Sequence, residues 1–371
     1  MRLAALSVMA VVMTAGCAQP TTPNASTASE ARASTSPVVT PPSCKAPAST
    51  YGLLFSWGRD AAQPGRLEMV APSGCVGASA PVAASSAPRC DSGAAAFLPP
   101  PVSATKTKVY FRDGDTKIRY LTPTGEVGDV TTVPGGPTVV SSFSVSIDDQ
   151  RIAVVVLDFS NPPTVSLQLY VEDLVGGGHH TVIFTNTVDS YKKNQFNLWP
   201  RGWHAGDLVL AVVMTCVFEP VPNPAAWHIV DAGTAMRKVS VGTDACSPGW
   251  WPSPAGLACF DYKSSQTNLY DWSGRITATV ATNPESRQAV LSPSGAVFST
   301  VAGGGLGDPS PVTSVYKATG GSPATFPGAM ACLWIDETAM LAQGAVIQYP
   351  SGVIVSETST GQCAGRFPGG L

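Results

Sequence analysis

Six aromatic or cationic residues carry the clearest chemical signal in this sequence: Trp199, Arg201, Trp203, Trp250, Trp251 and Trp334. Trp and Arg are enriched at binding hot spots, and Trp stacks on sugar rings and on cations. The first three alternate along one expected strand, so we expect their side chains on the same side of it. Tryptophans also pack as core between sheets, and this is the more common role. The hypothesis is an aromatic and cationic binding surface.

Residues for acid-base, nucleophilic or metal chemistry are scarce. The four histidines are His179, His180, His204 and His228, and the chain lacks His-Glu-x-x-His, Gly-x-Ser-x-Gly and phosphate-loop motifs. Two adjacent histidines without a third ligand nearby are typical of an exposed loop. The Asp-box pattern Ser-x-Asp-x-Gly-x-x-Trp does not occur either. The sequence therefore gives no catalytic residue, no metal site and no cofactor.

Two acidic pairs and one Gly-rich run have simpler explanations than chemistry. Asp113-Gly114-Asp115 fits a hairpin turn better than a calcium site. Asp148 and Asp149 fit turn formers better than a pair of catalytic carboxylates. Residues 303–307 are Gly-rich like a nucleotide loop, but Pro309 follows and no helix does, so we expect a loop between strands.

The elements that must position these side chains are short strands. Beyond Tyr51 the apolar runs are rich in Val, Ile, Thr, Tyr and Trp, and Gly, Pro, Asp or Ser bounds each of them, which is typical of strands. The clearest runs are residues 107–111, 152–159, 167–171, 208–217 and 276–280.

These strands recur in a unit built from two alternating elements. One is a strand that runs into a turn glycine, and its seven copies end at Gly74, Gly125, Gly176, Gly233, Gly274, Gly320 and Gly352. The other is a tight turn that feeds an apolar strand, as in residues 147–153, 204–208, 253–258, 292–298 and 335–340. The alternation fits a four-stranded antiparallel blade, in which the tight turn joins the inner strands and the glycine the outer ones.

Blades arranged radially make a β-propeller. Shared among seven blades, residues 51–371 give about 46 residues each, near the ~40–50 that a blade takes. The fold class is therefore all-β, a seven-bladed β-propeller, with six blades also possible and a pair of β-sandwich domains as the main alternative. Residues 51–57 lack an innermost strand, and residues 361–367 are placed to supply it and to close the ring.

One copy of the tight turn also points to a family. Ser292-Pro293-Ser294-Gly295, followed by Val297-Phe298-Ser299, resembles the Ser-Pro-Asp-Gly repeat of TolB-like and WD-repeat-like propellers, with Ser294 where that family has Asp. The resemblance implies the same radial architecture.

The N-terminus has the features of a secretion signal. Arg2 precedes an apolar run, and small residues follow it, so residues 1–16 are predicted to be a signal peptide. Thr14-Ala15-Gly16-Cys17 resembles the lipobox of bacterial lipoproteins, which implies lipid attachment at Cys17, although Thr14 replaces the usual Leu. An ordinary secretion signal is the alternative. Residues 17–50, rich in Ser, Thr, Pro and Ala, are predicted to be a disordered linker.

Cysteine number agrees with this assignment. Once Cys17 is assigned to lipid, an even eight remain: Cys44, Cys75, Cys90, Cys216, Cys246, Cys259, Cys332 and Cys363. In an oxidising compartment they are disulfide candidates, with 105 possible pairings. Blade topology gives a weak preference for Cys216 with Cys246.

Composition limits the possible partners. Charged residues are 13% of the chain and the net charge is -3, which disfavours nucleic acid. We therefore expect an extracytoplasmic lipoprotein on the cell membrane, whose propeller is a non-catalytic binding platform for an envelope protein, a peptide or a glycan. The alternative is a propeller enzyme acting on extracellular carbohydrate, a glycosidase or a lyase. Two facing carboxylates in the channel would favour the alternative.

Overall fold

The computed structural model describes residues 43–90, 95–96, 98–189, 195–217, 224–242, 246–303, 310–342, 345–357 and 361–371. The predicted signal peptide, Cys17 and residues 18–42 of the predicted linker lie outside this part of the chain, as do residues 304–307 of the Gly-rich loop. No helix in the described part is long and apolar enough to cross a membrane.

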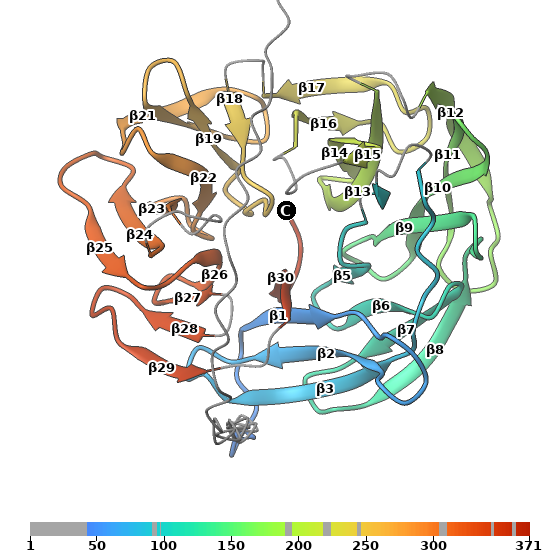
Figure 1. Cartoon of the computed structure of the whole chain (residues 1–371), viewed down its shortest axis with the longest axis horizontal. Helices are drawn as coiled ribbons and strands as arrows, with labels where there is room; N and C mark the ends of the chain where they lie inside the picture. Colours follow the sequence, from blue (N-terminus) through green and yellow to red (C-terminus); the bar gives the residue numbers. More distant parts are fainter. Residues whose placement is uncertain are drawn as a thin grey trace, which may run out of the picture. The chain divides into compact units, whose positions relative to one another are not determined.

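The described residues form seven four-stranded antiparallel sheets, each a blade of a β-propeller (Figure 1). From the innermost strand outward, blade 1 is β30 (Gln362–Phe367), β1 (Tyr51–Ser56), β2 (Gly65–Val70) and β3 (Val76–Val82). Blade 2 is β5 (Val102–Ala104), β6 (Val109–Asp113), β7 (Lys117–Leu121) and β8 (Val127–Thr132). Blade 3 is β9 (Val139–Val145), β10 (Arg151–Asn161), β11 (Thr164–Asp173) and β12 (Thr181–Asp189).

The other four blades follow the same order. Blade 4 is β13 (Phe196–His204), β14 (Asp207–Met214), β16 (Ala226–Val230) and β17 (Arg237–Val241). Blade 5 is β18 (Cys246–Pro248), β19 (Leu257–Asp261), β20 (Gln266–Tyr270) and β21 (Ile276–Ala281). Blade 6 is β22 (Ser286–Leu291), β23 (Val297–Ala302), β24 (Val312–Lys317) and β25 (Ala324–Pro327). Blade 7 is β26 (Ala331–Asp336), β27 (Ala339–Ala342), β28 (Ala345–Gln348) and β29 (Ile354–Glu357). Outside the blades, β4 (Ala95–Ala96) pairs with β15 (Cys216–Val217).

Both repeated elements occupy the places that the sequence predicts. All seven copies of the strand that runs into a glycine are third strands of blades, and the glycine lies in the turn to the outermost strand. Six of these glycines have φ between 74° and 89°, a conformation that side chains with a Cβ disfavour. Gly233 is the exception, because the positive φ of its turn falls on Ala235. The tight turns join the two inner strands of blades 3 to 7.

The strands are apolar without strict alternation because each blade is covered on both faces. In β10, Ala153, Val155 and Leu157 belong to a cluster shared with Trp203 of blade 4. Ile152, Val154 and Val156 belong to another cluster, shared with Tyr110 of blade 2. A strand inside a blade therefore has apolar side chains at successive positions. A strand in a sheet with one solvent-exposed face has them at every second position.

The ring closes as the sequence predicts. β30 pairs with β1 in antiparallel fashion, and Figure 1 shows it near the middle with β1, β2 and β3 successively farther out. A disulfide between Cys363 of β30 and Cys332 of β26 links blade 1 to blade 7. The first and last parts of the chain thus share one blade, which is fixed to its neighbour.

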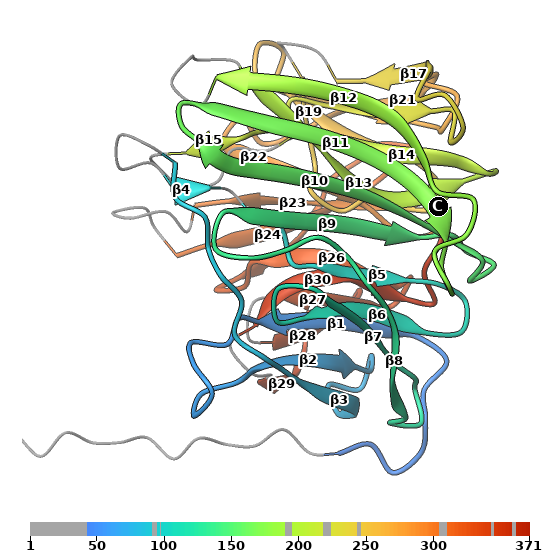
Figure 2. The same cartoon turned by 90° about the vertical axis from the view of Figure 1, so that its right-hand side faces the viewer.

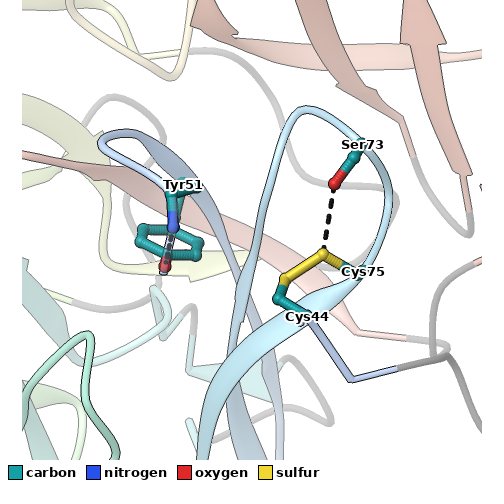
Figure 3. The surroundings of a disulfide bond; sticks show 5 residues. Cys44, Tyr51, Ser73 and Cys75 are labelled. Atoms are coloured by element: carbon teal, nitrogen blue, oxygen red, sulfur yellow. Dashed lines mark hydrogen bonds between the residues drawn. A yellow bond between two sulfur atoms is a disulfide. The ribbon is translucent and has the colours of Figure 1, made fainter. Parts of the chain in front are cut away.

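The eight cysteines form four disulfides, and the expected pairing of Cys216 with Cys246 is wrong. Cys246 bonds to Cys259 on the neighbouring strand of its own blade, because β18 and β19 are in register there. Cys216 bonds instead to Cys90, in the connection from blade 1 to blade 2. The remaining pair, Cys44 with Cys75, holds the segment before blade 1 against the turn between β2 and β3 (Figure 3).

Residues 43–50, which the sequence assigned to the linker, are fixed to blade 1. Ser43 makes a bridge to Val76, and the backbone N–H of Ala48 donates to the hydroxyl of Tyr51 at 2.6 Å. In Figure 3, Ser73 lies beside the disulfide, with its Oγ 3.1 Å from the Sγ of Cys75.

Removing the closing strand should destabilise the whole propeller. We expect a chain that ends at residue 360 to lose cooperative unfolding in calorimetry. Blade 1 then lacks its inner strand, and the face of blade 7 that packs on this strand becomes exposed to solvent. The matched control is Cys332→Ser with Cys363→Ser, which keeps β30. Its unfolding should stay cooperative, with a melting temperature lower by roughly 5 °C, since a disulfide closing this loop contributes about 3–4 kcal/mol. A truncated chain that melts like the full one would contradict this role of β30.

Candidate functional site

A cavity of about 660 Å³ lies at the end of the central channel where the innermost strands begin. Its size is typical of a ligand site, for which ~300–1,000 Å³ is usual. Four tryptophans line it: Trp57, Trp199, Trp250 and Trp251. Among the described lining residues, Arg201 is the one charged side chain, and there is no carboxylate. The cavity therefore offers aromatic surface and a single cation.

A β-bulge in β13 decides where the predicted aromatic residues point. The register with β14 shifts between Pro200 and Gly202, so Trp199 lies opposite Ala211 and Trp203 opposite Leu208. Trp199 packs in the core shared with blade 5, and Trp203 packs in the core shared with blade 3. The expectation that these side chains share one side of the strand is wrong, because the extra residue of a bulge reverses the alternation.

Arg201 is the extra residue of this bulge, and it lines the channel. Its guanidinium lies over the ring of Trp251, 4.3 Å from the centroid. With the described residues its side chain makes no hydrogen bond and no ion pair. Burial lowers the pKa of Arg201 to about 10, so the group stays cationic at neutral pH. A half-buried cation that lacks a carbonyl or carboxylate partner among the described residues is only weakly stabilised.

The other predicted tryptophans divide between the cavity and the core. Trp250 and Trp251 follow β18 directly and line the cavity, with Trp250 packed on Trp199 at a centroid distance of 5.6 Å. Trp334 is 1% exposed, and its indole N–H donates to the carbonyl of Val290 at 3.2 Å. Trp334 therefore packs as core between blades 6 and 7, as Trp203 does between blades 3 and 4.

Sequence reasoning missed several residues of the cavity wall. Trp57 follows β1, Gln288 lies in β22, Met330 precedes β26 and Gln362 begins β30. The side chains of Gln288 and Gln362 make no hydrogen bond with described residues. Most of these positions are equivalent: they stand where an innermost strand starts. Aligning the seven repeats on their inner strands would have found them.

The connection from blade 1 to blade 2 forms part of the cavity rim. Asp115 accepts hydrogen bonds from the backbone N–H and the hydroxyl of Ser86, at 2.6 and 2.9 Å. Asp113 accepts from the N–H of Ala83 at 2.6 Å. Asp113-Gly114-Asp115 is the predicted hairpin turn, between β6 and β7, and its carboxylates hold this connection in place.

Farther along, the same connection is fixed to blade 4 by the Cys90–Cys216 disulfide and by the pairing of β4 with β15. Figure 2 shows β4 and β15 together at one end of the blade 3 strands, and the C-terminus at the other end. The cavity rim therefore combines loops from blade 1 with an attachment to blade 4.

At the other end, the channel narrows to a chamber of about 60 Å³. Arg201 and Trp251 line both spaces, and Arg366 of β30 lines the chamber. The last residues of the chain close it: the N–H of Gly369 donates to the carbonyl of Thr105, and Leu371 packs against Gly202. The channel is thus wide at one end and narrow at the end that the C-terminal residues cover.

The remaining polar candidates lie away from the channel. His179 and His180 lie at the β11–β12 turn, and each Nδ1 is 2.7 Å from a carboxylate, of Asp173 and Glu172 respectively. Asp149 accepts hydrogen bonds from Thr107 and Tyr110 of blade 2, which makes it a turn residue that joins two blades. Among the described residues, no group of three His, Cys, Asp or Glu side chains could hold a metal ion.

Comparisons with known proteins find similarity in fold alone. No family model matches the sequence, and no curated protein matches it. Solved structures that are similar include an oligogalacturonate lyase in complex with manganese, at 12% identity over 73% of this chain and 76% of that one, with a TM-score of 0.42. BamB from Moraxella catarrhalis is similar at 11% identity over 86% of this chain and 89% of that one, with a TM-score of 0.39. No function is transferred from either.

Tryptophans packed between blades should contribute more to the free energy of unfolding than tryptophans on the cavity wall. We expect Trp203→Ala to lower the free energy of unfolding by about 3–5 kcal/mol, because it empties a packed space between two blades. Trp57 is half-buried on the cavity wall, so Trp57→Ala should cost less, about 1–2 kcal/mol. Urea denaturation of both variants measures the difference. Equal losses would contradict the separation of core from cavity wall.

Proposed function

We propose that this chain is an extracytoplasmic lipoprotein, and that the wide mouth of its propeller binds a ligand without transforming it. The observation that carries the proposal is the cavity: about 660 Å³, four tryptophans, and no carboxylate among its described lining residues. Aromatic walls bind through stacking and exclusion of water. The ligand belongs to the cell envelope, as a protein segment, a peptide or a glycan.

The lining supports binding better than carbohydrate hydrolysis. Most glycosidases use two facing carboxylates about 5–10 Å apart, one to protonate the leaving group and one to attack or to activate water. Besides its indole rings, the described wall has one guanidinium, two side-chain amides and two hydroxyls, from Arg201, Gln288, Gln362, Ser85 and Ser86. None of these groups is a general base at neutral pH. Hydrolysis by a pair of carboxylates therefore has no apparatus among the described residues that line the cavity.

Membrane attachment is proposed from the sequence of the leader. Thr14-Ala15-Gly16-Cys17 resembles a lipobox, and the residues that follow are poor in apolar side chains. A lipid on Cys17 would tether the propeller to the membrane surface through this segment. The four disulfides are consistent with an oxidising compartment.

Lipid attachment at Cys17 has a direct test. We expect Cys17→Ala to move the protein from the membrane fraction to the soluble extracellular fraction, and mass spectrometry of the wild-type N-terminus to show a lipidated cysteine. Cys44→Ala with Cys75→Ala is a control, because it removes cysteines without touching the lipobox. A Cys17→Ala protein that stays in the membrane fraction would overturn the anchor.

Binding at the mouth is tested with the purified full chain. We expect panels of envelope-derived peptides and oligosaccharides to contain a ligand that binds without being cleaved. Trp57→Ala and Trp250→Ala should each weaken it about 10-fold or more while the chain stays folded. Tyr262→Ala removes an aromatic side chain that is 55% exposed outside the cavity, and it should leave the affinity unchanged. Release of shortened or unsaturated sugars by the pure protein would replace binding with catalysis.

A further inference from the structure

The narrow chamber holds two guanidinium groups that lack partners among the described residues. Arg201 reaches it from β13 and Arg366 from β30. The side chains of both make neither an ion pair nor a hydrogen bond there. Glu337 attracts Arg366 from beyond ion-pair distance, and one of its oxygens accepts the backbone N–H of Ser294 at 2.6 Å. The chamber is therefore a small, positively charged space.

The backbone of β13 fixes the position of Arg201. It is the extra residue of the bulge, flanked by Pro200 and by Gly202, where an added Cβ would meet Leu371 at 2.4 Å. Bulges are common next to functional sites, where they re-aim a side chain. Trp251 supports the guanidinium from one side at 4.3 Å. Because this guanidinium has no hydrogen-bond or ion-pair partner among the described residues, a ligand anion would complete its contacts.

The size of the two spaces indicates which part of a ligand meets this charge. The chamber, at about 60 Å³, has less than a tenth of the volume of the 660 Å³ cavity, and Arg201 and Trp251 line both. One small end group therefore enters the chamber, while the body of the ligand stays against the aromatic wall.

We propose that the chamber is a carboxylate-binding subsite, and that the ligand of the cavity is the C-terminal end of an extended peptide. The terminal carboxylate pairs with Arg201, with Arg366 adding positive charge. Apolar side chains of the preceding residues lie on Trp57, Trp250 and Trp251. This inference rests on the proposed binding function and names the chemistry of its ligand.

The wall favours a peptide over an acidic sugar. Each sugar ring brings several hydroxyl groups, which need hydrogen-bond partners when buried. The described wall offers few: the hydroxyl of Ser85 and the amides of Gln288 and Gln362 make no hydrogen bond with described residues, while Ser86 is already bonded to Asp115. A carboxamide both donates and accepts, which matches a peptide backbone. Leu98, Pro99 and Met330 complete an apolar lining that fits peptide side chains.

The test compares two pools of N-acetylated tetrapeptides made from Ala, Leu, Phe and Trp, identical except for a free carboxylate or a carboxamide at the C-terminus. Binding to the full chain is measured by calorimetry at fixed salt. We expect the free-acid pool to bind about 10- to 100-fold more tightly than the amide pool, the range for one desolvated charge-assisted pair. A trimer of a uronic acid is the third probe.

Variants assign the preference to Arg201. We expect Arg201→Met to abolish the difference between the two pools. The melting temperature should stay the same or rise, because the substitution removes a half-buried charge that pairs with no described residue and keeps an apolar side chain beside Trp251. Arg151→Met is the matched control. Arg151 also lies over a tryptophan, Trp203 at 4.7 Å, but lines neither space, so the preference should persist.

Three other outcomes would overturn the proposal, and each would point to a different conclusion about the ligand. Equal binding of the two pools, lost in Trp57→Ala, removes the carboxylate subsite but leaves binding at the mouth. Binding of the uronic acid trimer through Arg201, with neither peptide pool bound, replaces the peptide with an acidic sugar. Binding of none of the three probes overturns this ligand assignment, and the proposed function then depends on the panel of envelope ligands.

Discussion

The structure depends on the pairing of β30 with β1. Each blade buries apolar side chains on both faces, so no blade is stable unless a neighbour covers each side. An open row of seven blades would leave two apolar faces in water, at blade 1 and blade 7. β30 allows both faces to be buried, because it completes blade 1 and lies beside β26 of blade 7. The disulfide between Cys332 and Cys363 fixes this contact. The radial arrangement, and with it the central channel, follows from this closure.

Closure of the ring creates the central channel, but irregular segments of the inner strands and loops determine which side chains line it. Regular inner strands bury Trp203 and Trp334 between blades. The bulge in β13 instead turns Arg201 inward, and the residues after β18 place Trp250 and Trp251 on the wall. The connection from blade 1 to blade 2, held by Asp113, Asp115 and the Cys90–Cys216 disulfide, shapes the wide mouth. The C-terminal residues close the narrow end. The charged and most of the aromatic groups of the candidate site therefore come from departures from the repeat, while equivalent positions at the starts of inner strands supply part of the remaining wall.

The sequence predicts what is local and periodic. Strand runs, turn glycines and tight turns repeat, so blade number, strand order and the closing role of residues 361–367 follow from them. The bulge in β13 could not be predicted in this way. The residues from Trp199 to Trp203 look like a regular alternating strand, and the extra residue shows only in the register of β13 with β14. The pairing of Cys90 with Cys216 was missed because it joins the connection after blade 1 to blade 4, a contact between blades that are not neighbours. Four of the six residues that the sequence analysis grouped together line the cavity, whereas Trp203 and Trp334 pack between blades; the four are Trp199, Arg201, Trp250 and Trp251.

Amide hydrogen exchange of the intact, oxidised chain tests the closed ring most directly. If β30 is the inner strand of blade 1, its amides that bond to β1 exchange only on global unfolding, as slowly as those shared by β1 and β2. Rapid exchange throughout β30, with β1 and β2 still protected, would contradict the account, because the channel and its cationic chamber would then lack their closing wall.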